Sequence, residues 1–370
     1  MGHVRRAKGG NWQARYRDPT GRERARTFPR KIDAERFLAL VEVEKVRGEW
    51  VDPEAGKVTV AEFLERWYAA TVTLKPKTRA GYRSLLDSRI LPYLGQLQLR
   101  RVDPLLVREW IADLQEDGIS ASRIRQARNV IHAVFGLAQQ ASVIARNPVE
   151  GIKTPPLPVT NRRFLTPEQV RLLAATMPDR YQVLAYVLAY TGIRFGEAAA
   201  LRRARCDVAA SRLDIAESLA EVAGDLHFGS TKTHRRRTVA IPATVRDLLM
   251  SHLETVKQAP EALVFTSPTG QPLRYSNFRN RVWIPGTEAA GLPGLDIHEL
   301  RHTAASLMIR AGADPKLIQT QLGHASIAIT YDVYGHLFPD RLDELAYKLD
   351  ELIRNGRLER DQDRSTGRTL

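Results

Sequence analysis

The residues best suited to chemistry gather between Asp296 and His336. This segment contains His298, Arg301, His302, His324, Tyr331, Tyr334 and His336, and thus four of the nine histidines of the chain. Asp296 can cap a helix with an apolar stripe, and Gly312 can end it. On such a helix His298 and Arg301 lie three residues apart and project from one face. An arginine can bind two phosphate oxygens while an imidazole donates to a third or moves a proton, so the pair suits an anion.

A zinc site and a purely structural role are the alternatives for these histidines. The letters HELRH match the HExxH pattern, with His298 and His302 one helical turn apart and Glu299 as a base. The extended form of that pattern requires glycine where this chain has Ala305, and no third ligand follows at the required spacing. A single histidine can also be solvated or satisfied in a core, but this interpretation weakens as the group grows.

The composition indicates two or three domains and a polyanionic partner. A chain of 370 residues with 43% hydrophobic content can fill real cores. The net charge of +14 and the pI near 10.0 favour nucleic acid. A membrane surface is the weaker alternative because the sequence contains no apolar run of about 18 residues and no signal-type core, so we expect a cytoplasmic protein. Cys206 stands alone, which excludes an internal disulfide and a cysteine-based zinc site.

Positive charge is concentrated near the start, where residues 1–31 hold ten Lys or Arg against two acidic residues. Trp12, Ala14 and Tyr16 alternate with polar residues as in a strand, and residues 18–21 supply a turn. The pattern predicts a hairpin with one basic face and a helix from Asp33 over the other face. The predicted DNA contacts of this hairpin are Arg15, Arg17, Arg22, Arg24 and Arg26. A disordered basic arm is the alternative.

A helical pattern follows, from a capping box at Thr59 and Glu62 to about residue 147, and predicts a small all-α domain. Lys77 and Arg79 belong to a set of basic residues that could touch DNA phosphates, with a solvated charged face as the alternative. Prolines at 155, 156 and 158 mark an extended connector. A hinge between two DNA-facing bodies is its simplest use.

Beyond the connector, helical patterns enclose short predicted strands over residues 211–241. Arg194 lies where a turn enters a helix, and Glu197 three residues on could hold it in place; a surface salt bridge is the alternative. Lys232 lies between two predicted strands and could enter a groove as a proton donor. Beside it, Arg235 and Arg236 could grip backbone phosphates.

Five motifs, TGIRFGE, the lysine of TKT, HELRH, LGHASI and TYDVYGH, occur here in the order typical of the tyrosine recombinases, also called phage integrases. The chain resembles this family over about residues 160–340. More loosely, residues 59–150 resemble its core-site DNA-binding domain and residues 1–50 its arm-site-binding domain. The resemblance implies a multidomain, mainly α fold with small β-sheets. The implied parts are an N-terminal sheet with a helix (1–50), an all-α core-binding domain (58–150), a linker (151–163), a mixed α+β catalytic domain (164–345) and a C-terminal tail (346–370).

Carried over to this sequence, the resemblance assigns phosphate activation to Arg194, Lys232, His298, Arg301 and His324, and nucleophilic attack to Tyr334. It implies no metal and no cofactor. Tyr331 is the competing nucleophile, but Asp332 would be a poor neighbour for a phenolate. Tyr334 lies ten residues beyond His324 and is followed by Gly335 and His336, a spacing that the family shares. Arg235 and Arg236 stand where the family often has a small polar residue.

The chemistry is consistent with these residue types. Attack on a phosphodiester builds charge on two non-bridging oxygens, which Arg194 and Arg301 can neutralise without a metal. A tyrosine with a pKa of about 10 needs a base or a cationic site. His298 could take its proton or hydrogen-bond the phosphate, and His324 could stabilise the transition state. Lys232 could protonate the departing 5′ oxygen, leaving a 3′-phosphotyrosyl link without any need for ATP.

We therefore expect an integrase that cuts and rejoins specific sites in double-stranded DNA, acts as a homotetramer on two duplexes, and integrates or excises a mobile element. Accessory DNA-bending and directionality proteins can accompany such an enzyme. A type IB topoisomerase would share the chemistry, and a non-catalytic DNA-binding regulator would keep the basic domains. After the nucleophile, an apolar stripe is formed by Leu342, Leu345, Leu349 and Leu352. In the family such a helix commonly docks on a neighbouring subunit, and packing on its own domain is the alternative.

Overall fold

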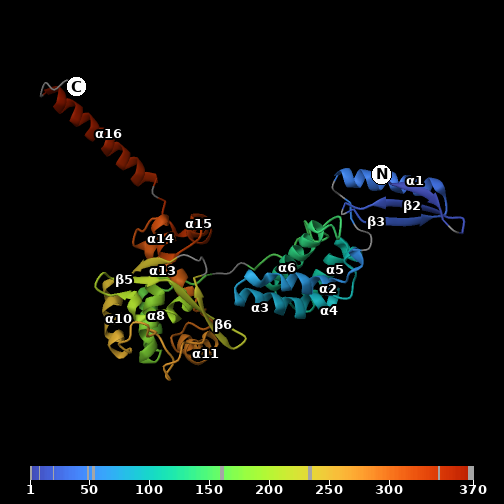
Figure 1. Cartoon of the computed structure of the whole chain (residues 1–370). Helices are drawn as coiled ribbons and strands as arrows, with labels where there is room; N and C mark the ends of the chain where they lie inside the picture. Colours follow the sequence, from blue (N-terminus) through green and yellow to red (C-terminus); the bar gives the residue numbers. More distant parts are fainter. Residues whose placement is uncertain are drawn as a thin grey trace. The chain divides into compact units, whose positions relative to one another are not determined.

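The structure, a computed structural model, describes residues 2–7, 9–19, 21–47, 50–51, 55–158, 162–231, 236–340 and 342–365, with the backbone alone for 355–365. The chain divides into two units, Met1–Thr160 and Asn161–Leu370. Both contain helices and small antiparallel sheets (Figure 1), so the mainly α fold with small sheets is confirmed. Across the described parts of the chain, no helix is long and apolar enough to cross a membrane.

A three-stranded antiparallel sheet with one helix begins the first unit. The strands are β1 (His3–Arg6), β2 (Trp12–Arg17) and β3 (Glu23–Phe28), in the order β1-β2-β3, and the helix is α1 (Lys31–Arg47). The helix lies along one face of the sheet (Figure 1), where Tyr16, Val41 and Trp50 form a small core. The predicted hairpin and covering helix are confirmed, although α1 begins at Lys31 rather than Asp33.

The prediction that this hairpin has one basic face is wrong. The register pairs Arg15 with Ala25, Arg17 with Glu23, Tyr16 with Arg24, and Ala14 with Arg26. Because directly opposite residues share a face, Arg24 and Arg26 lie on the face that α1 covers, whereas Arg15 and Arg17 lie on the other. Each strand alternates as predicted, but the turn sets which face the second strand presents, and periodicity alone does not specify that.

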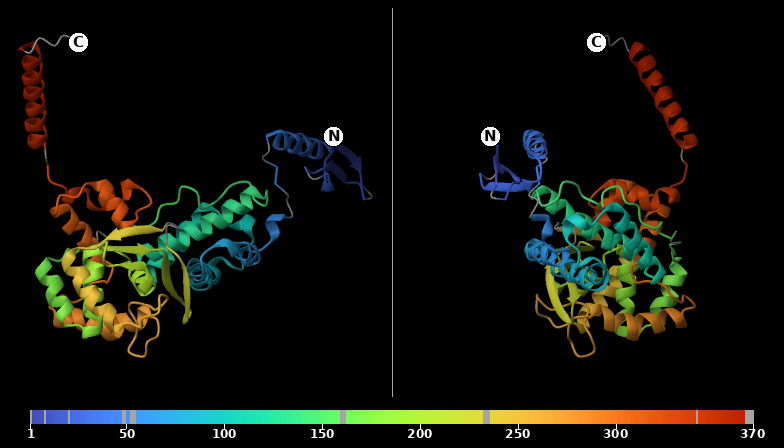
Figure 2. Two further views of the ribbon diagram at one scale, coloured as in Figure 1. Left: turned by 60° about the vertical axis from the view of Figure 1, so that its left-hand side comes forward. Right: turned by 90° about the vertical axis from the view of Figure 1, so that its right-hand side faces the viewer.

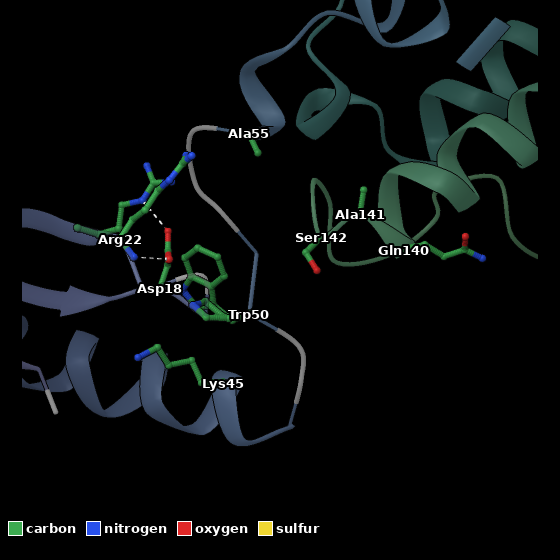
Figure 3. Close-up of a pocket in the computed structure, with 10 residues that line it drawn as sticks. Asp18, Arg22, Lys45, Trp50, Ala55, Gln140, Ala141 and Ser142 are labelled. Carbon is green, nitrogen blue, oxygen red and sulfur yellow. Dashed lines mark hydrogen bonds and ion pairs between the residues drawn. The ribbon is translucent and has the colours of Figure 1, made fainter. Parts of the chain in front are cut away.

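Asp18 closes the hairpin turn (Figure 3). Its residue is only 5% exposed, and its carboxylate accepts hydrogen bonds from the backbone nitrogen of Arg22 (3.0 Å) and from Nε of Arg24 (3.2 Å). The guanidinium of Arg26 lies 5.2 Å from the centre of the Phe37 ring on α1. Arg24 and Arg26 therefore make contacts that stabilise the sheet and its helix.

The rest of the first unit is helical. Its elements are α2 (Val60–Ala69), α3 (Pro76–Leu85), a π-helical turn (Leu86–Ile90), α4 (Leu91–Leu94), α5 (Pro104–Glu116) and α6 (Ala121–Gln140). The capping box at Thr59 forms as predicted, because Thr59 Oγ1 accepts from the Glu62 nitrogen (3.2 Å) and Glu62 Oε2 accepts from the Thr59 nitrogen (2.9 Å). Trp110 and Phe135 are buried in the hydrophobic core that these helices share.

The second unit packs helices around α8 (Asp179–Thr191). The helices are α7 (Pro167–Ala175), α9 (Phe195–Ala199), α10 (Ala243–Thr255), α11 (Tyr275–Phe278), α12 (Ile284–Ala289), α13 (Glu299–Arg310), α14 (Pro315–Leu322), α15 (Ile327–Tyr334) and α16 (Leu342–Ser365). α8 contacts α7, α10 and α13. Because α8 and α13 are neighbours in space, the end of α8 reaches the segment that carries the histidines.

Short strands lie within 211–241, as predicted. β4 (Cys206–Asp207), β5 (Arg212–Ile215) and β8 (Arg237–Ala240) form one sheet, while β6 (Glu217–Val222) and β7 (Asp225–Ser230) form a separate ribbon, seen in yellow in Figure 2. Ala223 and Gly224 form the tight turn of this ribbon with positive φ. Lys232 follows this ribbon in the sequence and lies outside the described residues.

In the last helices, one expectation needs correction and one alternative is not met. α13 begins at Glu299, so Asp296 does not cap it directly; instead its Oδ1 accepts from the His298 nitrogen (2.8 Å) in the turn before the helix. The leucine stripe of α16 is solvent-exposed, from 50% at Leu349 to 69% at Leu342, so it does not pack on its own domain.

Gly192 offers a test of how α8 meets α14. It ends α8 at φ +68°, and an added Cβ would lie 2.3 Å from Leu322 Cδ2. We expect Gly192→Ala to destabilise the second unit by about 1–2 kcal/mol from its backbone conformation and by about 1–3 kcal/mol more from the clash. Gly291→Ala is the matched control, since Gly291 has φ +71° but open space around its Cβ position. Equal losses of melting temperature in the two variants would contradict the close contact.

Candidate active site

Arg194 is the N-cap residue of α9, three residues after α8 ends. Its Nη1 donates to Glu197 Oε1 (3.0 Å), and its backbone nitrogen donates to Glu197 Oε2 (2.9 Å). Arg237, at the start of β8, binds the same carboxylate in a bidentate manner: Nη1 donates to Oε1 (3.0 Å) and Nη2 donates to Oε2 (2.7 Å). The Glu197 side chain is completely buried. It therefore joins two arginines from separate parts of the chain.

The charge of Glu197 is maintained by these partners. Burial alone would raise the pKa of the Glu197 carboxyl, but hydrogen bonds and charge from Arg237 and Arg194 outweigh burial and lower it. Arg237 also donates from Nε to the Gln321 carbonyl (3.2 Å) at the end of α14. Glu197 thus joins α9 to β8 through Arg237, and Arg237 joins β8 to α14.

Arg301 lies on the first turn of α13 and is 3% exposed. Its Nη1 donates to the Gly192 carbonyl (2.6 Å), whereas its buried Nη2 has no hydrogen-bond partner. Burial and the positive charge of Arg194 lower the pKa of Arg301 to about 9, and Glu197 opposes them. A buried cationic donor left open beside a second guanidinium is a place for an anion, because an anion would satisfy both the charge and the N–H group.

Tyr334 is the last residue of α15 and is 1% exposed. Its hydroxyl lies 2.8 Å from Nδ1 of His302 on α13. The His324 ring stacks on the Tyr334 ring, with centroids 6.3 Å apart and planes 12° apart. α13, α14 and α15 lie together (Figure 1), and the phenol at the end of α15 contacts His302 on α13 and His324 just after α14.

Tyr331 differs from Tyr334 in its surroundings. Tyr331 is 52% exposed and its ring packs on Phe338, at a centroid distance of 6.0 Å. Only one of the two candidate tyrosines therefore lies with the histidines and arginines.

Two imidazoles of the site, those of His302 and His324, have lowered pKa values and are neutral at pH 7. Burial first, and then the charge of His298, Arg162 and Arg301, lowers the pKa of His302 to about 4. Burial and the charge of Arg301 and Arg194 lower the pKa of His324 to about 4 as well. Burial raises the pKa of Tyr334, although Arg301 and Arg162 oppose the rise. The phenol consequently keeps its proton in the DNA-free chain.

The structure brings together Arg194, Glu197, Arg301, His324 and Tyr334. His298 joins them through His302, since the two rings meet edge to face with centroids 5.2 Å apart. Lys232 and Arg235 lie outside the described residues. Arg236 is mainly exposed and pairs with Asp214 instead, with its Nη2 2.6 Å from Asp214 Oδ2.

Two residues of the site were missed as functional candidates. Arg237 belongs to the basic run that begins at Arg235, and composition alone does not distinguish it from its neighbours. Strand periodicity does, because Arg237 lies on the same face of β8 as the buried Val239 and pairs with Ile215. For His302, the HExxH pattern indicates only the role of a zinc ligand. No sequence pattern relates it to Tyr334, which lies 32 residues away.

The zinc alternative finds no further ligand in the fold. Where side chains are described, no three His, Cys, Asp or Glu residues come close enough to hold a metal ion together. Glu299, the proposed base, instead accepts hydrogen bonds from the backbone nitrogens of Asp296 (2.8 Å) and Arg163 (3.1 Å). His302 is turned toward Tyr334.

The contrast between Arg237 and Arg301 can be measured. We expect Arg237→Met to lower the local free energy of unfolding by on the order of 3 kcal/mol, because it breaks a buried ion pair. Arg301→Met should cost clearly less, since it removes a cation without an anionic partner. Hydrogen exchange of α8 and α13 peptides, followed by mass spectrometry, measures both variants. A larger loss in Arg301→Met would contradict the assignment of the open cation.

Comparisons with known proteins agree with this geometry. The family model "Phage integrase family" matches residues 163–341, and models of phage integrase N-terminal and SAM-like domains match 1–47 and 59–115. The integrase of Mycobacterium phage D29 is 31% identical over 369 residues, covering 95% of this chain and 96% of the relative. The ICEBs1 integrase of Bacillus subtilis is 27% identical over 355 residues, covering 91% and 95%.

Solved structures share the fold. The Tn1549 transposon integrase in complex with transposon right-end DNA matches with a TM-score of 0.69 at 19% identity, over 80% of this chain and all of that one. The lambda integrase tetramer bound to a Holliday junction matches with a TM-score of 0.59 at 20% identity, over 87% of this chain and 95% of that one. Together with the full-length similarity to phage integrases, these matches establish that the chain belongs to the phage integrase family and is a site-specific tyrosine recombinase.

Proposed function

We propose that Tyr334 attacks one phosphodiester of double-stranded DNA, which Arg194 and Arg301 hold between them. The observation that carries this proposal is the unpartnered, buried Nη2 of Arg301 beside the guanidinium of Arg194. A scissile phosphate would supply the missing anion and acceptor. The two arginines would then stabilise the charge that develops on its non-bridging oxygens.

The remaining groups take the roles that their chemistry allows. His298 hydrogen-bonds the phosphate, and His324, oriented through its Nδ1 by Thr330 Oγ1 at 2.9 Å, stabilises the transition state. Lys232 protonates the departing 5′ oxygen. Glu197 keeps Arg194 in position. The product is a 3′-phosphotyrosyl link that a second DNA end reverses, without metal, cofactor or ATP.

We extend the reaction to a homotetramer that exchanges strands between two duplexes and so integrates or excises a mobile element. The solved lambda integrase assembly is a tetramer on a Holliday junction, and the relatives come from phages and from ICEBs1. The exposed leucines of α16 suit docking on a neighbouring copy. We place the reaction in the cytoplasm, where accessory DNA-bending and directionality proteins can bind the same DNA complex.

Residues 1–50 and 58–150 are proposed as the arm-site and core-site DNA-binding domains, joined by the linker 151–163 to the catalytic domain 164–345 and the tail 346–370. On the sheet, Arg15 and Arg17 occupy the face that α1 leaves uncovered, which makes them the phosphate contacts we favour. Lys77 is exposed and also suits a phosphate, whereas Arg79 stacks on Tyr68 with its guanidinium 4.8 Å from the ring centre.

The nucleophile assignment has a direct test. On a nicked suicide DNA substrate, the wild-type chain should form a covalent adduct that maps to the Tyr334 peptide. Tyr334→Phe should abolish the adduct, because it removes the attacking oxygen, while Tyr331→Phe should keep it. Denaturing gels and mass spectrometry of the trapped peptide provide the measurement. An adduct on Tyr331, or DNA binding by the wild-type chain with no adduct, would refute the assignment.

The corrected sheet geometry predicts which arginines touch DNA. The double variant Arg15→Gln, Arg17→Gln should bind duplex DNA more weakly, and the slope of log affinity against log salt should become shallower by about 0.9 for each lost phosphate contact. Arg24→Gln is the control: its guanidinium is held by Asp18, so the slope should not change. A salt titration of fluorescence anisotropy checks both. The reverse order of effects would contradict the proposed DNA-facing surface.

A further inference from the structure

The hydroxyl of Tyr334 is held by a residue that has no part in the function proposed above. Nδ1 of His302 lies 2.8 Å from the phenolic oxygen, within hydrogen-bond distance, and the two ring centroids are 5.7 Å apart at 60°. His302 comes from the first turn of α13, next to Arg301. The phenol is 1% exposed, so water has little access to this contact.

We propose that His302 is a further catalytic residue, which accepts the phenolic proton of Tyr334 at Nδ1 while the tyrosine attacks the DNA phosphate. This inference rests on the proposed function of Tyr334. In the step, the bond between Tyr334 Oη and phosphorus forms and the bond between phosphorus and the 5′ oxygen breaks. The phenolic proton passes to His302, and Lys232 gives a proton to the departing 5′ oxygen. On rejoining, His302 returns its proton to the phenol.

The position of His324 favours His302 for this task. The His324 ring is parallel to the Tyr334 ring but offset from it, with centroids 6.3 Å apart, and its Nδ1 is 2.9 Å from Thr330 Oγ1. Nδ1 of His324 is thus engaged by Thr330, whereas Nδ1 of His302 lies beside the oxygen that must lose a proton. His298 meets the His302 ring edge to face.

The charges around His302 connect proton transfer to DNA binding. His298, Arg162 and Arg301 face it with positive or potentially positive charge, Asp296 opposes them, and Tyr334 and His324 complete the surroundings. Burial and these groups hold the pKa of His302 well below its usual value, so its imidazole is neutral in the free chain. A phosphodiester bound at Arg301 adds a negative charge at this point. It therefore favours the protonated imidazole when substrate is present.

A substitution series separates proton acceptance from support of the fold. His302→Asn keeps an oxygen near the place of Nδ1 that can still receive the phenolic hydrogen bond, but it cannot take up the proton. Single-turnover cleavage of the suicide substrate should slow by about 10²-fold or more in this variant. Melting temperature and DNA affinity should stay unchanged.

The decisive measurement places a ring-fluorinated tyrosine at position 334 through a recoded codon. Its more acidic phenol depends less on a base, so it should restore most of the rate of His302→Asn and change the wild-type rate little. His324→Gln carrying the same fluorinated tyrosine should remain slow. The wild-type rate should also fall toward acid pH as His302 takes a proton, and His302→Asn should lose this acid limb.

Three results would overturn the role of His302. They are an undiminished or faster rate in His302→Asn, a slow rate that the fluorinated tyrosine does not raise, and an equal rescue of His324→Gln. A wild-type chain that forms no phosphotyrosyl adduct would instead overturn the proposed function, so the two failures are distinguishable.

Discussion

The buried carboxylate of Glu197 is the interaction on which the site depends. Three guanidinium groups, those of Arg194, Arg237 and Arg301, converge near it and repel one another in a setting of low polarity. Glu197 forms ion pairs with Arg194 and Arg237. Arg301 instead donates one hydrogen bond to a backbone carbonyl and keeps one buried nitrogen, Nη2, without a partner. The result is a fold that balances two of its three buried cations and leaves the positive charge of Arg301 without an anion, at the point where we propose that the DNA phosphate binds.

The three arginines come from different elements, so the site exists only when the second unit is folded. α8 delivers Arg194 through the left-handed turn at Gly192, and α13 packs on α8 and delivers Arg301 and His302. β8 places Arg237 against both Glu197 and the end of α14. The hydrophobic core around α8 thus positions polar groups separated by more than a hundred residues in the chain.

Local chemistry in the sequence accounts for much of the fold. The capping box at Thr59 and the strand pattern within 211–241 predict elements that the structure contains. What escaped prediction depends on contacts between elements. The face occupied by Arg24 follows from the hairpin register, and the true start of α13 follows from a turn that uses Asp296 and Glu299 together.

The candidate site divides in the same way. Arg194, Glu197, Arg301, His324 and Tyr334 could be named from motifs in order, because those motifs are short and local. Arg237 and His302 could not be assigned roles, since their meaning lies in partners on other elements. Lys232, predicted from its place between strands, lies outside the described residues.

The burial of Tyr334 has a consequence for the cell that carries this enzyme. Tyr334, the proposed nucleophile, ends α15 and is 1% exposed, so in the DNA-free chain its hydroxyl meets little solvent. Under the proposed mechanism, cleavage would then require both a bound target and a local opening that lets Tyr334 reach the DNA backbone. The packing of this one side chain would thereby limit cleavage of DNA that is not a target.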